Sequence, residues 1–161
     1  YNPLFKGLPL IGNIVVGGIL GLVFIFTECS INGNVDMMLI PFLLTTTLSI
    51  IRELCKDCAD ITGDSTVNLK TFPSKYGLIK TLWILRFLAI VLCFLAITPY
   101  LSGQYGIIYF ITIILGVEIP ILYTLFKVLS KQSGMTDYIK VSKILKGITI
   151  TGMLAILASA F

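Results

Sequence analysis

Histidine is absent from this chain of 161 residues, and charged residues are scarce at 12% of the total. Without histidine, Ser–His catalysis, histidine proton shuttles and histidine metal sites are all excluded. Soluble domains average about 25% charged residues, so a chain that is 57% hydrophobic, with a mean hydropathy of +0.99, cannot surround one core with a water-compatible surface. A soluble globular domain is therefore excluded. Apolar runs recur up to the last residue, which also excludes a secretory signal as their explanation.

Five long apolar segments are present instead. A bilayer core of about 30 Å requires about 20 apolar residues per helix, and these runs are too long and too uniformly apolar for β-barrel strands. We therefore predict an all-α, multi-pass transmembrane helix bundle that forms one domain over 1–161. The connection at 58–76 is long for a helical bundle, which makes it a candidate functional segment. The expected helices cover about 8–27, 37–57, 77–98, 105–129 and 144–161.

The basic residues predict the orientation in the membrane. The connectors 28–36 and 99–104 contain no Lys or Arg, and all 12 basic residues fall on the other side or near its interface. Because membrane proteins keep Lys and Arg on the cytoplasmic side, we expect 58–76 to face the cytoplasm from the cell (plasma) membrane. The same spread of basic residues over several loops argues against nucleic-acid binding. The chain begins at Tyr1 rather than Met, and we expect it to be part of a longer protein.

Acidic residues gather at the end of the second apolar segment. Glu53, Asp57, Asp60 and Asp64 are spaced by four, three and four residues, which keeps them on one helical face where they need a positive partner. One explanation of this acidic cluster is that the helix ends at the membrane interface and its carboxylates face water. However, the apolar run before Arg52 is so short that a spanning helix must carry carboxylates to the membrane edge. Clustered carboxylates suit Mg²⁺ or Mn²⁺, and Mg²⁺ is commonly held together with substrate phosphates.

Two runs of residues carry a resemblance to a known family. The first is Arg52-Glu53…Lys56-Asp57…Asp60…Gly63-Asp64, followed by Lys70-Thr71-Phe72-Pro73…Gly77. It looks like the second aspartate-rich region of the UbiA superfamily of intramembrane prenyltransferases, and within it most like the digeranylgeranylglyceryl phosphate synthases. The second run is Lys6…Pro9-Leu10-Ile11-Gly12-Asn13, which is similar to the start of the family's fifth helix. Family members have nine helices, so the resemblance implies that this chain is the C-terminal part of a UbiA-type bundle.

The resemblance also implies roles for the acidic residues. Asp60 and Asp64 match the family's D-x-x-x-D metal-binding pair, Asp57 matches the preceding aspartate, and Glu53 matches the acid one turn earlier. All four are expected metal ligands for Mg²⁺, the implied cofactor. Asp57, Asp60 and Asp64 are the expected catalytic residues.

Basic residues near the acids are expected to bind the phosphates of a substrate. Lys70 matches the family's basic residue that meets the diphosphate. Arg86, about two turns into the third segment, could snorkel to the interface or turn inward to the diphosphate, and we favour the second. The expected substrate-binding residues are Arg52, Lys56, Lys70 and Arg86.

The match to the family is incomplete. Ala59 stands where the nearest group usually has an acid, Asn68 where it has Gly, and Phe72 where it has Leu. The family's first aspartate motif, N-D-x-x-D, is absent from this chain. We therefore expect a complete site to need the upstream half of the same protein as a partner.

Other residues invite functional explanations. Cys55 and Cys58 form a C-x-x-C, but without further suitable ligands we interpret them as neutral helix residues. Glu118 lies within the fourth segment, either in a functional cavity or bonded to backbone that Pro120 leaves free. Gly17 and Gly21 form a G-x-x-x-G, which favours close helix packing.

Three functions follow from these observations. The resemblance implies an enzyme that moves a prenyl group, expected to be geranylgeranyl, from its diphosphate to geranylgeranylglyceryl phosphate in archaeal-type ether lipid biosynthesis. The alternative is transfer to an aromatic acceptor in quinone, tocopherol or chlorophyll-type synthesis. A phosphate-bearing acceptor needs extra basic residues near the cytoplasmic mouth, and the Lys-rich stretch 127–146 is compatible with this. A cation-binding transporter is the third, although the paired broken helices of transporters are not seen.

Overall fold

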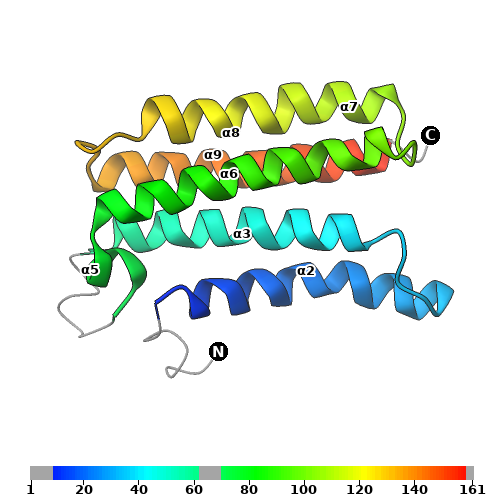
Figure 1. The fold of residues 1–161 in the computed structure, drawn as a ribbon, viewed down its shortest axis with the longest axis horizontal. Coiled ribbons are helices and arrows are strands. Elements are labelled where there is room, and N and C mark those ends of the chain that lie inside the picture. The colour runs from blue at the N-terminus through cyan, green and yellow to red at the C-terminus, as the bar shows by residue number, and fades with distance from the viewer. Residues whose placement is uncertain (1–8, 62–69, 159–161) are drawn as a thin grey trace.

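The structure, a computed structural model, describes residues 9–61 and 70–158, and every regular element within these ranges is helical (Figure 1). One spanning helix, Ile107–Val128, is continuous but changes its winding, with two π-helical turns that alternate with α-helical ones. The elements are α2 (Ile11–Asn32), α3 (Leu39–Ala59), α5 (Phe72–Tyr76), α6 (Leu78–Leu101), α7 (Ile107–Ile113), η1 (Ile114–Glu118), α8 (Ile119–Tyr123), η2 (Thr124–Val128) and α9 (Met135–Ala158). The predicted all-α, multi-pass bundle is confirmed.

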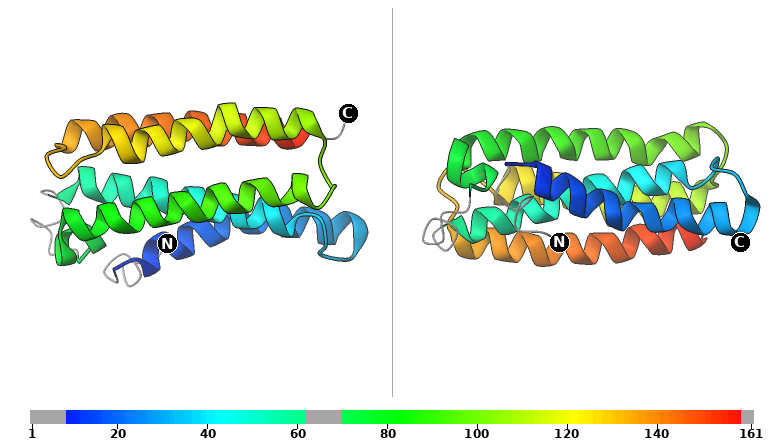
Figure 2. Two further views of the ribbon diagram at one scale, coloured as in Figure 1. Left: turned by 45° about the horizontal axis from the view of Figure 1, so that its top comes forward. Right: turned by 90° about the horizontal axis from the view of Figure 1, so that it is seen from below.

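Four helices are long and apolar enough to cross a membrane: Ile11–Asn32, Leu78–Leu101, Ile107–Val128 and Met135–Ala158. The second predicted span, α3, has 21 residues, slightly fewer than these, and is more polar because its last two turns carry four charges. It runs the length of the bundle in the middle of the other helices, as the views in Figures 1 and 2 agree. Its neighbours therefore shield a helix that is too polar to face lipid alone. The chain is an integral membrane protein.

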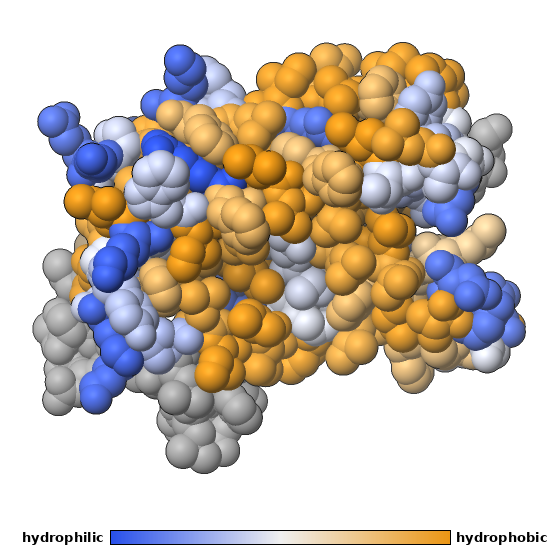
Figure 3. Space-filling view, viewed as in Figure 1, coloured by the Kyte–Doolittle hydropathy of each residue, from blue (hydrophilic) through white to orange (hydrophobic). Residues whose placement is uncertain are grey.

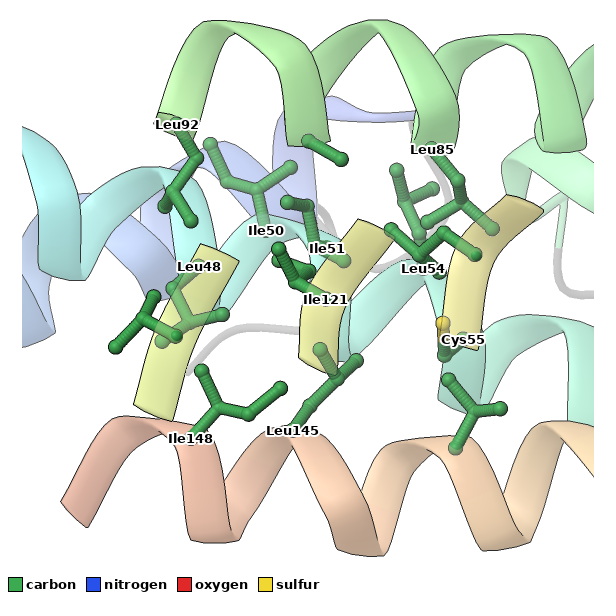
Figure 4. Close-up of a cluster of buried hydrophobic side chains, with 14 of the residues drawn as sticks. Leu48, Ile50, Ile51, Leu54, Cys55, Leu85, Leu92, Ile121, Leu145 and Ile148 are labelled. Atoms are coloured by element: carbon green, nitrogen blue, oxygen red, sulfur yellow. The ribbon is translucent and has the colours of Figure 1, made fainter. Parts of the chain in front are cut away.

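The core forms where α3 meets α6, α8 and α9. Ile51 and Leu54 of α3 are fully buried, and Leu85, Ile121 and Leu145 reach them from the three other helices. Figure 4 shows these side chains pointing toward one another between the helices. The outer faces are apolar as well, and aromatic side chains such as Phe94 and Trp83 lie exposed on them. The bundle thus has an apolar interior and an apolar exterior, as a membrane protein requires.

Helices α2 and α3 form the closest pair, and the G-x-x-x-G of α2 accounts for it. A Cβ atom on Gly17 would lie 2.8 Å from the backbone oxygen of Thr46, and one on Gly21 would collide with the Thr46 hydroxyl. At the far end, both carboxylate oxygens of Glu28 accept backbone N–H groups that precede α3, from Met37 at 2.8 Å and Met38 at 2.9 Å. The small residues set the distance between the two helices, and Glu28 satisfies N–H groups at the start of the second.

The last helix begins nine residues earlier than the sequence predicts, at Met135 rather than near 144. The lysines at 140, 143 and 146 obscure this start in a hydropathy profile. A capping interaction marks it: the Asp137 carboxylate accepts the N–H of Gly134 at 3.1 Å, and an acid in the first turn suits the positive end of the helix dipole. The extra turns bring Ser142 and Lys143 of α9 beside the charged end of α3.

Polar residues collect at the two ends of the bundle, with an apolar band between them (Figure 3). One end holds the C-terminal turns of α3, helix α5, and the first turns of α6 and α9. The basic residues of the described ranges lie at or near this end. Which end faces the cytoplasm stays a prediction, but the partition of charge that underlies it is present in three dimensions. The predicted site lies at this basic end.

Candidate prenyl diphosphate site

The three acids of α3 within the described residues have different surroundings. The Glu53 carboxylate accepts a hydrogen bond from Lys56 Nζ at 2.8 Å and lies 3.7 Å from the Arg52 guanidinium. This is the positive partner that the acid spacing predicts. The C-terminal end of a helix disfavours negative charge, so the acids of this end weaken the helix unless cations meet them.

Asp57 points toward α2. Its Oδ2 accepts a hydrogen bond from Asn13 Nδ2 at 2.8 Å, and Asn13 is only 9% exposed. The two motifs that carried the family resemblance therefore touch each other in the fold. Asn13 belongs to the motif Lys6…Asn13, but the family resemblance implied no role for it. An amide in the first turn of a helix whose next thirteen residues are apolar or glycine is a signal of a buried polar contact.

Asp60, about one turn further along, lines a cavity of about 220 Å³ between α3 and α9. Lys56 and Asp60 line it from α3, and Ser142 and Lys143 line it from α9, with Ala59 and Ile139 as the apolar part. Asp60 thus lines the same cavity as two lysines. Neither Ser142 nor Lys143 was singled out from the sequence, since only the earlier start of α9 brings them here.

The charged residues of this cavity fit a Mg²⁺ ion bound together with a diphosphate better than a metal site made only of protein side chains. Within residues 9–61 and 70–158, no three His, Cys, Asp or Glu side chains gather closely enough to hold a metal ion. Mg²⁺ needs only one or two carboxylates when substrate phosphates complete its coordination. Asp60 beside lysines supplies that combination. Asp64, its predicted metal-binding companion, lies outside the described residues.

The K-T-F-P run forms the entrance to the next helix. Lys70 is exposed, and Thr71 begins the short helix α5, where its carbonyl oxygen accepts a hydrogen bond from the Ser74 hydroxyl at 2.9 Å. Gly77 ends α5 and begins α6 with φ of 83°, a left-handed conformation that favours glycine. Turn chemistry thus explains Thr71, Pro73 and Gly77, and leaves Lys70 at the basic end of the bundle.

Arg86 turns inward, as the sequence analysis favoured, but it reaches backbone rather than the acids. Its Nε donates to the carbonyl of Leu125 at 3.2 Å and its Nη2 to that of Leu129 at 3.1 Å, with the guanidinium over the Phe126 ring. These carbonyls lie at the end of the π-helical turn η2, where helix carbonyls lack partners. Arg86 therefore ties α6 to η2, and its predicted contact with substrate stays a prediction.

An apolar groove of about 590 Å³ leads along α2, α3 and α9 toward the charged end. Leu20 and Val23 line it from α2, and Met153 and Leu157 from α9. On α3 its lining continues through Thr45, Ser49 and Arg52, and the next residues on that face, Lys56 and Asp60, line the charged cavity. The groove is lined mainly by apolar residues and has one charged residue, Arg52, on the side of the charged cavity.

The cysteines of α3 and Glu118, the other candidates from the sequence, are buried among packed helices. Cys55 and Cys58 are buried in the core of α3, and all four cysteines are free thiols. Glu118 is 7% exposed within the π-helical turn η1, and its Oε1 has no hydrogen-bond partner among the described residues. The carbonyl of Gly116, one turn before Pro120, accepts the Thr151 hydroxyl instead at 2.8 Å.

Comparison with known proteins places this architecture in a family. A solved structure described as "Structural and mechanistic insights into the biosynthesis of Digeranylgeranylglyceryl phosphate synthase in membranes" superimposes with a TM-score of 0.85 at 33% identity, over 93% of this chain and 52% of the other. Curated digeranylgeranylglyceryl phosphate synthases are similar in sequence. That of Methanopyrus kandleri is 32% identical over 99% of this chain and 57% of its own length, and that of Methanococcus maripaludis strain S2 is 32% identical over 98% and 55%.

The chain thus spans about half the length of these relatives. The profile of the UbiA prenyltransferase family matches residues 1–142, which include α2, α3, the charged cavity's α3 wall and the K-T-F-P turn. The chain belongs to the UbiA prenyltransferase family.

Proposed function

We propose that this chain forms the C-terminal part of a Mg²⁺-dependent intramembrane prenyltransferase. It transfers a geranylgeranyl group from its diphosphate to geranylgeranylglyceryl phosphate, which forms an ether bond of an archaeal-type lipid. The acceptor is proposed from the relatives that bear the name digeranylgeranylglyceryl phosphate synthase and are about 32% identical. The charged end faces the cytoplasm of a cell whose plasma membrane holds the bundle.

The observation that carries the proposal is the order of residues along one face of α3, which lines first the apolar groove and then the charged cavity. A prenyl diphosphate has an apolar tail and a head with several negative charges. The groove of about 590 Å³ suits the tail, and Arg52 lies where it approaches the cavity that holds Lys56 and Asp60. One face of α3 therefore lines both the groove that suits the apolar tail and the cavity that suits the charged head group.

The chemistry follows from the charge of the head group. Lys56 and Lys70 donate hydrogen bonds to diphosphate oxygens, which favours departure of the diphosphate from the allylic carbon. Asp60, together with Asp57 and Asp64, would hold Mg²⁺, which would withdraw further charge from the leaving group. The apolar walls of α2 and α9 exclude water, which would otherwise capture the prenyl cation before the acceptor hydroxyl attacks it.

The rest of the site is proposed to come from the upstream half of the same protein. A groove bounded by α2, α3 and α9 needs a further wall to surround a lipid tail, and a diphosphate needs more metal ligands than Asp60 and its neighbours provide. The first aspartate motif of the family, N-D-x-x-D, would supply these ligands from upstream helices.

The test is a comparison of acceptors. The full-length protein in membranes, supplied with radiolabelled geranylgeranyl diphosphate and Mg²⁺, is offered geranylgeranylglyceryl phosphate or 4-hydroxybenzoate. We expect a labelled digeranylgeranyl lipid from the first acceptor. Labelled aromatic product alone would replace the ether-lipid function with the aromatic one, and no transfer to either acceptor would contradict the enzyme.

A further inference from the structure

The cavity between α3 and α9 has one wall that the proposed function does not use. Ser142 and Lys143 face Lys56 and Asp60 across about 220 Å³. The hydroxyl of Ser142 and the ammonium of Lys143 are hydrogen-bond donors, and the ammonium carries a positive charge. The α9 wall is thus built from groups that bind anions.

The α3 wall alone supplies too little positive charge to bind a phosphate group. Lys56 already donates to Glu53 at 2.8 Å, so part of its charge is balanced within α3. Asp60, at the end of the same helix, adds a negative charge to the cavity. A phosphate group held here through a metal on Asp60 would need a further positive partner, and Lys143 is the ammonium on the opposite wall.

The position of this wall along α9 links it to the lipid groove. Thr149, Met153, Ile156 and Leu157 of α9 line the groove, and Ser142 and Lys143 come two turns before Thr149 on the way to the charged end. A lipid whose tail follows α9 through the groove brings its head group to Lys143. The helix therefore contacts both parts of one ligand.

We propose that Lys143, assisted by Ser142, binds a phosphate group of a prenyl-lipid substrate. The phosphate belongs either to the donor diphosphate or to the acceptor monophosphate, since both ligands combine an apolar tail with phosphate oxygens. This inference rests on the proposed function. It makes α9 a wall of the head-group site, in addition to the acidic helix α3.

Kinetics of the full-length protein separate the two sources of phosphate. Lys143→Met keeps the apolar stem and removes the charge. We expect KM to rise about ten- to hundredfold for one of the two substrates, as loss of a charge-assisted hydrogen bond implies, with the other KM little changed. Lys143→Arg should recover most of the loss, and Ser142→Ala should give a smaller rise for the same substrate. Lys140→Met, on the same helix but outside the cavity lining, is the matched control and should stay within about twofold of wild type.

Binding provides a readout that does not depend on turnover. Inorganic diphosphate and glycerol 1-phosphate are titrated as probes with Mg²⁺, and thermal unfolding checks that each variant is folded. Weaker binding of one probe to the Lys143→Met protein identifies the phosphate it meets. Equal binding and equal KM values in an active, folded variant would overturn the inference while the proposed function stood. An inactive wild type that still binds a probe through Lys143 would instead contradict the proposed function alone.

Discussion

The close contact of α2 with α3 makes a strong prediction about Gly17. A methyl group added there would lie 2.8 Å from the backbone oxygen of Thr46 and 3.0 Å from Cγ1 of Ile50. Ordinary contact begins at 3.4 Å, so the helices must separate by about 0.6 Å, the difference between these distances. Overpacking of this kind costs ~1–3 kcal/mol, while alanine regains ~1 kcal/mol of helix propensity over glycine.

Gly18→Ala is the matched control, because a methyl group there meets nothing within 4 Å. Both variants gain the same propensity, so their difference isolates the clash. We expect the free energy of unfolding of Gly17→Ala, measured by SDS titration in mixed micelles, to fall ~1–3 kcal/mol below that of Gly18→Ala. Gly17→Ala should also slow prenyl transfer, since Asn13 lies one turn away and holds Asp57. Equal stability of the two variants would refute the packing argument.

Three further predictions concern orientation, thiols and completeness. Cysteine labelling should place position 70 inside the cell and position 32 outside, because basic residues gather at one end, and labelling of both from one side would overturn this orientation. Cys55→Ser and Cys58→Ala should change transfer rates by less than about threefold, since both thiols are buried in the core and belong to no metal-binding cluster among the described residues. Zinc content is measured alongside the transfer rate. A large loss of transfer together with bound zinc in the wild type would contradict this prediction. The 161-residue chain alone should transfer no labelled prenyl group, and co-expression with the upstream half should restore some transfer because membrane helices associate after separate insertion; robust activity of the chain alone would show that one motif suffices.

The helix bundle was predictable from the sequence because the length of each apolar run predicts a membrane helix, and the basic residues indicate which helix ends lie together. The start of α9 was not, because Lys140, Lys143 and Lys146 lower the hydropathy of its first turns, and only the cap formed by Asp137 marks the true beginning. The winding of Ile107–Val128 was also hidden, since a π-helical turn leaves no periodic signal in a uniformly apolar segment.

The acids of the site were predictable from spacing, but their partners were not. A helical face drawn from positions 53, 57 and 60 cannot show that Glu53 pairs with Lys56, that Asp57 meets Asn13 or that Asp60 faces α9. Each of these outcomes depends on which neighbouring helix packs on that side. Lys143 could not be picked out from the Lys-rich stretch 127–146 for the same reason, since its proposed role depends on the packing of α9 against α3, with 83 residues between Asp60 and Lys143.

Metal-dependent transfer tests whether Asp60 and Asp64 hold Mg²⁺ for the diphosphate, as we propose. The full-length protein is stripped with chelator, and the transfer of radiolabelled geranylgeranyl is measured as Mg²⁺ is added back, for wild type, Asp60→Ala and Asp64→Ala. We expect wild type to be inactive without Mg²⁺ and to recover with it, and both variants to remain folded but inactive at every concentration. Near-normal turnover of either variant, or undiminished transfer by wild type in chelator, would contradict the account.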